Sequence, residues 1–399
     1  MVCKHYAAPL FALVISVTLR AADADGFTLL FNGKDLSGWV NMNVAPGTFT
    51  VRDGIIVSTG KPTGVMRTEK EYENFILELE WSHRKPGGNA GVFIWSDPLP
   101  AQGVPFAKAI EVQVLDGNES KSYTSHGDVF SIHGASMVPD RPHPNGSQRC
   151  LPSERRAKPS PEWNHYRVEC RAGVIKLSVN GKEVSGGHDC NPRKGYICLE
   201  AEGSECHFRN LKIKELPSSG AKTDFPAEHR KPFERLYTGV DLSGWQPSTV
   251  GKPLWESRDW ILACPGTPES NGTEFTSERR LGDFLFLCDW RWTGIPPGSA
   301  AASIRIAGPN DVRLLAAGGS GLLVTRDGEV KPRESADRPA GEWNRLFVTV
   351  RKGRATVQLN GKTVVDHSPL SEGKLPAPIA LVDPGCPMEF ANLLIQALE

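Results

Sequence analysis

The segment Ala109–Gly117, AIEVQVLDG, alternates apolar side chains with an acid and an amide. In a β-strand this spacing places Glu111 and Gln113 on one face, about 6–7 Å apart. A later segment, GYICLEAEG, places Glu200 and Glu202 on one face in the same way. Carboxyl groups that converge on one surface can share a proton, act as a base with a raised pKa, or bind a cation. A solvated strand end is the alternative interpretation of the same pattern.

The segment Pro86–Trp95, PGGNAGVFIW, adds a polar group next to glycines. Glycine allows the backbone to approach a ligand or a neighbouring strand closely. The amide of Asn89 can both donate and accept hydrogen bonds. A tight hairpin bend is the alternative interpretation here. Trp95 has two interpretations as well, because an indole ring can stack on a sugar or pack in a core.

The chain contains two copies of one pattern. FTLLFNGKDLSGW at Phe27–Trp39 returns as FERLYTGVDLSGW at Phe233–Trp245, and EWN followed by an NGK hairpin also occurs twice. Positions kept in both copies are expected to serve the fold, whereas chemistry found in one copy is a candidate for function. The second copy has DVRLLAAGG and ALVDPG where the first has its acidic segments. We therefore expect the acid–amide pair and both later glutamates to be absent from the second copy.

The first copy is longer than the second between the shared DLSGW and EWN motifs, mostly within residues 117–161. Polar insertions of this kind often build a rim or lid over a binding face. The insertion holds His126, Asp128, His133, His143 and Arg149. Histidines with an aspartate suggest a metal site, but this spacing matches no standard ligand set.

Strand signals dominate the rest of the sequence. FILELEW at Phe75–Trp81 alternates apolar and acidic residues, as in a half-buried strand. Asn-Gly pairs at 180–181 and 360–361 favour type I′ hairpin turns. Many short strands separated by Gly and Pro predict an all-β fold of two sandwiches or jelly rolls. The expected boundaries are 25–216 and 232–399, joined by a linker at 217–231.

Composition and the N-terminus indicate where the protein acts. Forty-six basic and 46 acidic residues balance, so nothing suggests a nucleic-acid partner. Residues 1–24 resemble a signal peptide, with Lys4, a short apolar run and small residues at the end. We therefore expect a secreted or periplasmic protein with no membrane span in the mature chain. Eight cysteines remain outside this segment, and Cys150 with Cys190 is one candidate disulfide.

The motifs FNGKDLSGW, PGGNAGVF, IEVQVLD, EWN with its hairpin, and GYICLEAEG occur here in the order of a known family. The chain resembles the DUF1080 family, the 3-keto-disaccharide hydrolase domain, over Phe27–Leu216. Over Phe233–Leu398 only the structural motifs remain. The resemblance implies two concanavalin-like jelly-roll β-sandwiches in tandem, the second degenerate, with carbohydrate held on a concave sheet face.

The resemblance also implies an activity, the cleavage of glycosides that a separate sugar oxidoreductase has oxidised at C3. A C3 ketone acidifies the C2 proton, so a base can remove it and expel the C1 substituent, after which water adds. The expected catalytic residues are Glu111, Gln113 and Glu202, with Glu111 the first candidate for the base. The expected substrate contacts are Asn89, Trp95, Asp116, His133, Arg149 and Glu200. A divalent cation could polarise the ketone, with Glu111, Glu202 and His126 as candidate ligands.

Three functions therefore compete. The first is a secreted hydrolase, or lyase-hydratase, that acts on 3-keto-disaccharides through the first domain. The second is a non-catalytic, lectin-like tandem module, and the third is a spacer at a cell surface. An enzyme predicts convergent carboxyl groups in the first copy, and a lectin predicts aromatic platforms without them. A spacer predicts neither feature.

Overall fold

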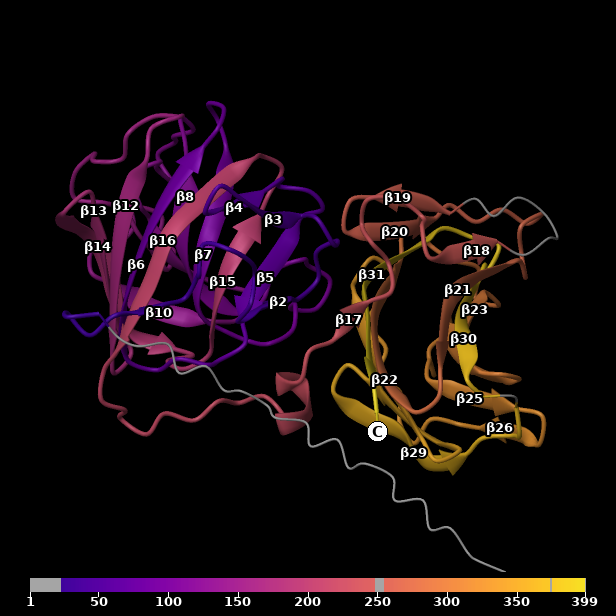
Figure 1. Cartoon of the computed structure of the whole chain (residues 1–399). Helices are drawn as coiled ribbons and strands as arrows, with labels where there is room; N and C mark the ends of the chain where they lie inside the picture. The colour runs from indigo at the N-terminus through magenta and orange to yellow at the C-terminus, as the bar shows by residue number, and fades with distance from the viewer. Residues whose placement is uncertain (1–22, 248–254, 374, 399) are drawn as a thin grey trace, which may run out of the picture.

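The computed structural model describes residues 23–247, 255–373 and 375–398. Strands β1–β16 form one half of the molecule and β17–β31 form the other, and the two lie side by side (Figure 1). The expected signal peptide falls almost entirely outside the described residues. Within the described part, no helix is long and apolar enough to cross a membrane.

Two antiparallel sheets form the first half. The first sheet runs β10 (Ser136–Pro139), β14 (Lys182–Asn191), β13 (Val174–Val179), β12 (Asn164–Arg171), β6 (Phe75–His83), β16 (Cys206–Glu215), β4 (Ile55–Ser58) and β3 (Phe49–Arg52), and β1 (Thr28–Leu29) pairs with β16. The second runs β11 (Arg149–Cys150), β9 (Val129–Ile132), β8 (Ala109–Leu115), β7 (Asn89–Ser96), β15 (Tyr196–Ala201), β5 (Gly64–Thr68) and β2 (Trp39–Asn41).

Two more sheets repeat this plan in the second half. One runs β19 (Glu256–Arg258), β20 (Ile261–Cys264), β31 (Met388–Ala397), β22 (Phe284–Trp292), β27 (Asn344–Arg351), β28 (Arg354–Leu359) and β29 (Lys362–Pro369), and β17 (Glu234–Arg235) pairs with β31. The other runs β18 (Trp245–Pro247), β21 (Glu274–Leu281), β30 (Ala377–Val382), β23 (Ala301–Ala307), β24 (Asn310–Leu315), β25 (Leu322–Thr325) and β26 (Gly328–Val330). A single 3₁₀ turn, η1 (Ala227–Arg230), is the one helical element in the described part of the chain.

Strand β6 shows why these sequences fold as a sandwich. Phe75, Leu77 and Trp81 are almost fully buried between the two sheets of the first half. Glu78 and Glu80 point away from that core and pair with arginines on the neighbouring strands. Period-two alternation thus buries one face and solvates the other. The predicted all-β, jelly-roll fold is confirmed.

The motifs shared by both copies are structural, as expected. The indole N–H of Trp39 donates to Leu30 O at 2.9 Å, and that of Trp245 donates to Leu236 O at 2.8 Å. Asn180 and Asn360 adopt positive φ in the two Asn-Gly turns. Both therefore close hairpins that match the twist of their strands.

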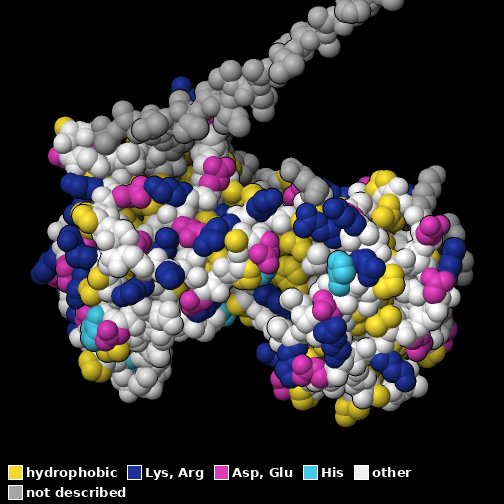
Figure 2. All heavy atoms as spheres, turned by 90° about the horizontal axis from the view of Figure 1, so that it is seen from below, with side chains coloured by type: hydrophobic (Ala, Val, Ile, Leu, Met, Phe, Trp, Pro, Cys, Tyr) yellow, Lys and Arg dark blue, Asp and Glu magenta, His cyan; other side chains and the backbone are white. Residues whose placement is uncertain are grey.

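Charged side chains are mixed on the surface, and the cysteines form no disulfide among the described residues. Basic and acidic side chains are interspersed over the face in Figure 2, in keeping with the zero net charge. All eight cysteines of the described residues are buried free thiols. The candidate Cys150–Cys190 disulfide is therefore not formed. Both side chains serve as small apolar groups in the core of the first half.

The loop between β7 and β8, residues 97–108, joins the two halves. Arg345 donates to Pro100 O at 2.8 Å, and the buried carboxylate of Asp289 accepts from Gly103 N at 2.9 Å. Asn392 donates to Val104 O at 3.0 Å. Leu99 also packs in an apolar cluster with residues of β22 and β31. The second half therefore holds this loop by both polar and apolar contacts.

Candidate active site

The candidate site lies on the outer face of the second sheet of the first half, on β7, β8 and β15. One side of each strand faces the core, as Val92, Val112 and Leu199 show. The opposite side carries Gly91 and Glu111, as the predicted alternation requires. The ladder pairs Phe93 with Glu111 and Gly91 with Gln113. The central strand, β7, thus separates the acid of β8 from the acids of β15.

Glu111 and Glu200 converge over Gly91, and we call these two residues the carboxyl pair. A Cβ atom at Gly91 would lie 2.7 Å from Oε2 of Glu200 and 2.9 Å from Oε1 of Glu111. Only a glycine leaves room for both oxygens at their present positions. Glu111 is 7% exposed and Glu200 is 1% exposed. A solvated strand end is therefore the wrong interpretation of this pattern.

A row of hydrogen-bonded polar side chains borders the carboxyl pair, and we call it the polar row. It comprises Asp128, Arg149, Gln113, Asn89 and Glu202. Arg149 Nη1 lies 2.8 Å from the fully buried Asp128 carboxylate and donates a long bond of 3.5 Å to Gln113 Oε1. Gln113 Nε2 donates to Asn89 Oδ1 at 2.8 Å, and Asn89 Nδ2 donates to Glu202. The hydrogen bonds set the orientation of both amides, which lie between the Arg149 guanidinium and the Glu202 carboxylate.

Burial and mutual repulsion raise the pKa of the acids at this site. Burial, followed by the charge of Glu202, raises the pKa of Glu111 to about 8 against the opposing influence of Arg149. Burial and the charges of Glu111 and Glu202 raise the pKa of Glu200 well above its usual range. Burial raises the pKa of Glu202 as well, while the hydrogen bond from Asn89 opposes that rise. Carboxyl groups this close cannot all ionise near neutral pH, so the pair retains a proton.

Trp95 lies in the core and not on the site face. Simple alternation would place it beside Phe93 and Gly91. A bulge in the β7–β15 pairing and a positive φ of 56° at Trp95 turn the side chain inward instead. The indole is fully buried and donates to Glu73 O at 2.7 Å. The core interpretation of Trp95 holds, and no ring face is left for a sugar.

Two further predicted substrate contacts lie outside the carboxyl pair and polar row. Asp116 accepts hydrogen bonds from Ser160 N at 3.0 Å and Gly87 N at 3.2 Å, so it ties loops together. His133 stacks on Phe106 and lines a different cavity, between the two halves. The insertion does reach the site, but through Asp128 and Arg149.

The residues present do not form a metal centre. Within residues 23–247, 255–373 and 375–398, no group of three or more His, Cys, Asp or Glu side chains is arranged to hold a metal ion. His126, a predicted ligand, instead pairs with Glu119 at 2.7 Å. Glu202 is held by Asn89, and Glu111 faces Glu200. The carboxyl groups that converge here can themselves accept and donate protons.

Strand register corrects one expectation about the second copy. Arg305 pairs with Asp311 on β23 and β24, as Phe93 pairs with Glu111 on β7 and β8. An acid therefore does remain in the register of Glu111, where none was expected. Arg313 stands in the register of Gln113, so the acid–amide pair itself is absent, as predicted. Arg305 Nε lies 3.1 Å from the Asp311 carboxylate and neutralises it.

The remaining differences between the copies are as expected. In register, Val382 takes the place of Glu200, because Ile304 pairs with Leu381 as Val92 pairs with Leu199. Ser303 stands where the first copy has Gly91, since both precede these paired residues on their strands. The second copy thus lacks both the second carboxyl group and the gap that would admit it.

Sequence reasoning missed two features of the site. The spacing of Asp128 among loop histidines does not reveal that its carboxylate is buried against Arg149. The glycines of Pro86–Trp95 predict close approach of the backbone, but not that Gly91 leaves the space in which two acids meet. Comparison of the two copies carries a signal for this role. Gly91 aligns with Ser303, so the second copy has a side chain at the position where the first copy has none.

Comparison with known proteins agrees with this assignment. The family model of the 3-keto-alpha-glucoside-1,2-lyase-like domain matches residues 26–214 and 232–396. A 3-keto-disaccharide hydrolase of Bacteroides thetaiotaomicron is 24% identical over 266 residues, which are 54% of this chain and 87% of that protein. The family resemblance drawn from the motifs, and its tandem arrangement, are confirmed.

Solved structures resemble one half of the chain. One from Parabacteroides distasonis, provisionally named a glycosyl hydrolase, is 26% identical, covers 49% of this chain and 95% of its own, and has a TM-score of 0.38. The carbohydrate binding module CBM66 from Bacillus subtilis is 12% identical, covers 45% of this chain and 96% of its own, and has a TM-score of 0.32.

Proposed function

Because the chain belongs to the 3-keto-alpha-glucoside-1,2-lyase-like family, we propose that its first copy cleaves glycosides that carry a ketone at C3. The observation that carries the proposal is the carboxyl pair, two buried acids that converge over Gly91. The family match and the Bacteroides relative support a hydrolase acting on carbohydrate. In the second copy Arg305 neutralises Asp311, the acid in the register of Glu111. This difference supports placing the reaction in the first copy.

The proposed reaction is an elimination followed by hydration. The C3 ketone acidifies the proton on C2, so a carboxylate removes it and an enolate forms. Collapse of the enolate breaks the bond between C1 and the glycosidic oxygen, and that oxygen takes up a proton and leaves as an alcohol. Water then adds to C1 of the resulting enone while C2 regains a proton. The net result is hydrolysis of the glycosidic bond.

The carboxyl pair supplies both the proton acceptor and the proton donor that this reaction needs. Glu111 is the base. Because its pKa is about 8, its carboxylate is a strong base that is still populated near neutral pH. Glu200 keeps its proton because its raised pKa disfavours ionisation. It is therefore the donor to the oxygen on which negative charge develops. The Oε2 atom of Glu200 is buried and has no hydrogen-bond partner among the described residues, so its hydrogen-bonding capacity is unused.

The polar row positions the sugar in this proposal. Gln113 and Asn89 each use one amide N–H within the row. Gln113 Nε2 also donates to Ala90 O at 3.4 Å. An amide nitrogen has two N–H groups, so Asn89 retains a second donor for a substrate hydroxyl. Arg149 lies 3.5 Å from the ring centre of Phe130, which fixes its guanidinium group. These residues are the proposed contacts that orient C2 toward Glu111.

A purely lectin-like function is the weaker candidate. A lectin face is expected to present aromatic platforms, but Phe93 is fully buried beneath Phe106. Phe130 is covered by Arg149. Secretion and a partner oxidoreductase that makes the 3-keto substrate remain predictions from the sequence.

The test is an assay of monosaccharide release from a 3-keto-disaccharide by the full chain. Wild type should release sugar, and Glu111→Gln should reduce kcat by about 10²–10⁴-fold, the usual contribution of a positioned base. Asp311→Asn in the second copy is the matched control and should leave the rate unchanged. No release by the wild type, or equal loss in both variants, would overturn the proposal.

A further inference from the structure

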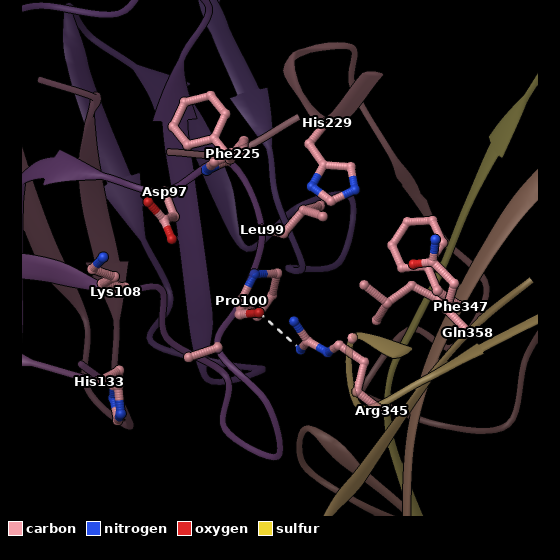
Figure 3. Close-up of a pocket in the computed structure, with 14 residues that line it drawn as sticks. Asp97, Leu99, Pro100, Lys108, His133, Phe225, His229, Arg345, Phe347 and Gln358 are labelled. Carbon is pink, nitrogen blue, oxygen red and sulfur yellow. Dashed lines mark hydrogen bonds between the residues drawn. The ribbon is translucent and has the colours of Figure 1, made fainter. Parts of the chain in front are cut away.

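A cavity of about 320 Å³ lies between the two halves, apart from the carboxyl pair (Figure 3). Its walls come from the loop after β7 and the start of β8, from the linker, and from the outer face of β22, β27 and β28. The residues that carry the argument are Asp97, Lys108, Phe225, His229, Phe347 and Gln358. We call this cavity the interdomain cleft.

Hydrogen bonds between the halves fix the walls of the interdomain cleft. Arg345 Nη2 donates to Pro100 O, the contact drawn as a dashed line in Figure 3. The same guanidinium makes two bonds, of 2.7 and 2.8 Å, to the buried Asp289. On the opposite wall, Asp97 N donates to Lys108 O at 3.0 Å and closes the end of the β7–β8 hairpin. The cleft is therefore preformed, as small-molecule sites usually are.

Flat rings line two sides of the cleft. His229 stacks on Phe347 with ring centres 5.2 Å apart and planes 22° apart. Phe225 stacks on Tyr196 at 6.0 Å and 26°. Phe225, His229 and Phe347 line the cavity and are half-buried. The Arg230 guanidinium also lies over the Phe225 ring, 5.3 Å from its centre, so the exposed parts of the rings are mainly their edges. Figure 3 shows Phe225 and His229 at one end of the cleft and Phe347 on the side of the second half.

Two oppositely charged side chains face the cleft without pairing to each other. Among the described residues, no ion pair joins Asp97 to Lys108 and no hydrogen bond reaches the Asp97 carboxylate; burial and the charges of Lys108 and Asp224 act on it. Burial raises the pKa of Asp97 to about 6, even though Lys108 opposes the rise. Half-buried charges lose hydration, so they gain from a ligand that restores hydrogen bonds. Gln358 adds an exposed amide at the rim.

We propose that the interdomain cleft is a second carbohydrate site, one that binds a neutral sugar of one or two rings. Aromatic rings match the apolar face of a pyranose, whereas a carboxylate, an ammonium and an amide match its hydroxyl groups. The hydroxyl groups of a sugar can donate to the carboxylate and accept from the ammonium, so a neutral sugar can satisfy both. The volume lies within the range of small-molecule pockets, roughly 300–1,000 Å³.

The cleft is distinct from the reacting groups and lies at the end of β8, the strand that carries Glu111. Lys108 precedes Glu111 by three residues, which is about 10 Å of extended chain. A sugar held in the cleft would keep glycan near the site face without entering the reaction. The inference rests on the unpaired charges and the half-buried rings, and not on the chemistry proposed for the carboxyl pair.

Titration of the full chain with unoxidised disaccharides tests the inference. Maltose, cellobiose and trehalose carry no C3 ketone, so they cannot undergo the proposed elimination. Saturation-transfer NMR and calorimetry should show saturable binding of at least one of them. Asp97→Leu with Lys108→Met should raise its Kd at least about tenfold, because two hydrogen bonds to charged groups are lost. Lys331→Met, on the exposed surface of the second half, is the matched control and should leave Kd unchanged.

Two further measurements make the result decisive. Gln358→Ala removes an exposed amide at the rim, so it should weaken binding without disturbing the fold. Glu111→Gln should retain disaccharide binding while it loses hydrolysis, which separates this site from the proposed reaction. The inference is overturned if none of the three disaccharides binds, if the Asp97 and Lys108 variant binds as wild type does, or if Glu111→Gln abolishes binding.

Discussion

Replacing Gly91 with alanine should reduce activity without reducing stability. The added Cβ would lie 2.7 and 2.9 Å from the two carboxyl oxygens of Glu200 and Glu111. Ordinary contact begins near 3.4 Å, so each oxygen must move by about half an ångström or more. Since a misplacement of about 1 Å can cost roughly 10²-fold in rate, we expect kcat/KM to fall by about 10–100-fold.

The stability of Gly91→Ala should be equal to or above that of wild type. Gly91 does not adopt the left-handed backbone region. Alanine at such a site lowers the entropy of the unfolded chain and so raises the free energy of unfolding by about 0.4–1 kcal/mol. The atoms that must yield are the ends of flexible side chains. Thermal unfolding followed by circular dichroism should therefore show no loss of Tm. Ser303→Gly, the reverse change in the second copy, is the control and should leave kcat/KM unchanged.

The pH profile of Gly91→Ala separates a displaced base from a general loss of structure. Wild-type kcat/KM should rise with pH around the pKa of Glu111, about 8. Moving Glu111 away from its acidic neighbours relieves repulsion, so the midpoint should shift to lower pH in the variant. The reasoning fails if Gly91→Ala is folded and retains wild-type kcat/KM with the wild-type midpoint.

Three further predictions follow from charges buried in the fold. Glu200 has a raised folded-state pKa, so its contribution to stability is present below about 4.3, its unfolded value, and is lost as pH rises through the folded pKa. Glu200→Gln should therefore raise Tm most at pH 8–9, as scanning calorimetry would show, and should lower activity in the release assay. A variant Tm equal to that of wild type at every pH would contradict this prediction. Arg345→Met should cost about 3–5 kcal/mol in urea unfolding, because it leaves the fully buried Asp289 without its guanidinium. Arg333→Met, which breaks an exposed pair, should change the unfolding free energy by less than about 1 kcal/mol, and equal costs in the two variants would argue against the interdomain role. Glu111→Gln should abolish the rise of kcat/KM with pH, and a profile that persists would assign the titration to another group.

Local alternation made the strands predictable. In FILELEW every second residue is apolar, and the structure buries one face of β6 and solvates the other. Asn-Gly pairs specify their own turns through the left-handed region. Comparison of the two copies also separated structural from chemical positions, since DLSGW and EWN keep their hydrogen bonds in both halves. The all-β fold, its duplication, and Glu111, Gln113, Glu200 and Glu202 as site candidates were accessible by this route.

Contacts between strands far apart in sequence were not accessible. The carboxyl pair forms because β7 lies between β8 and β15, an order that neither strand specifies by itself. A bulge at Trp95 moves a predicted sugar contact into the core, because one extra residue reverses the direction of the side chains that follow. Register likewise places Asp311 opposite Arg305. Composition and spacing therefore determined which residues carry chemistry, whereas sheet order and register decided which of them meet.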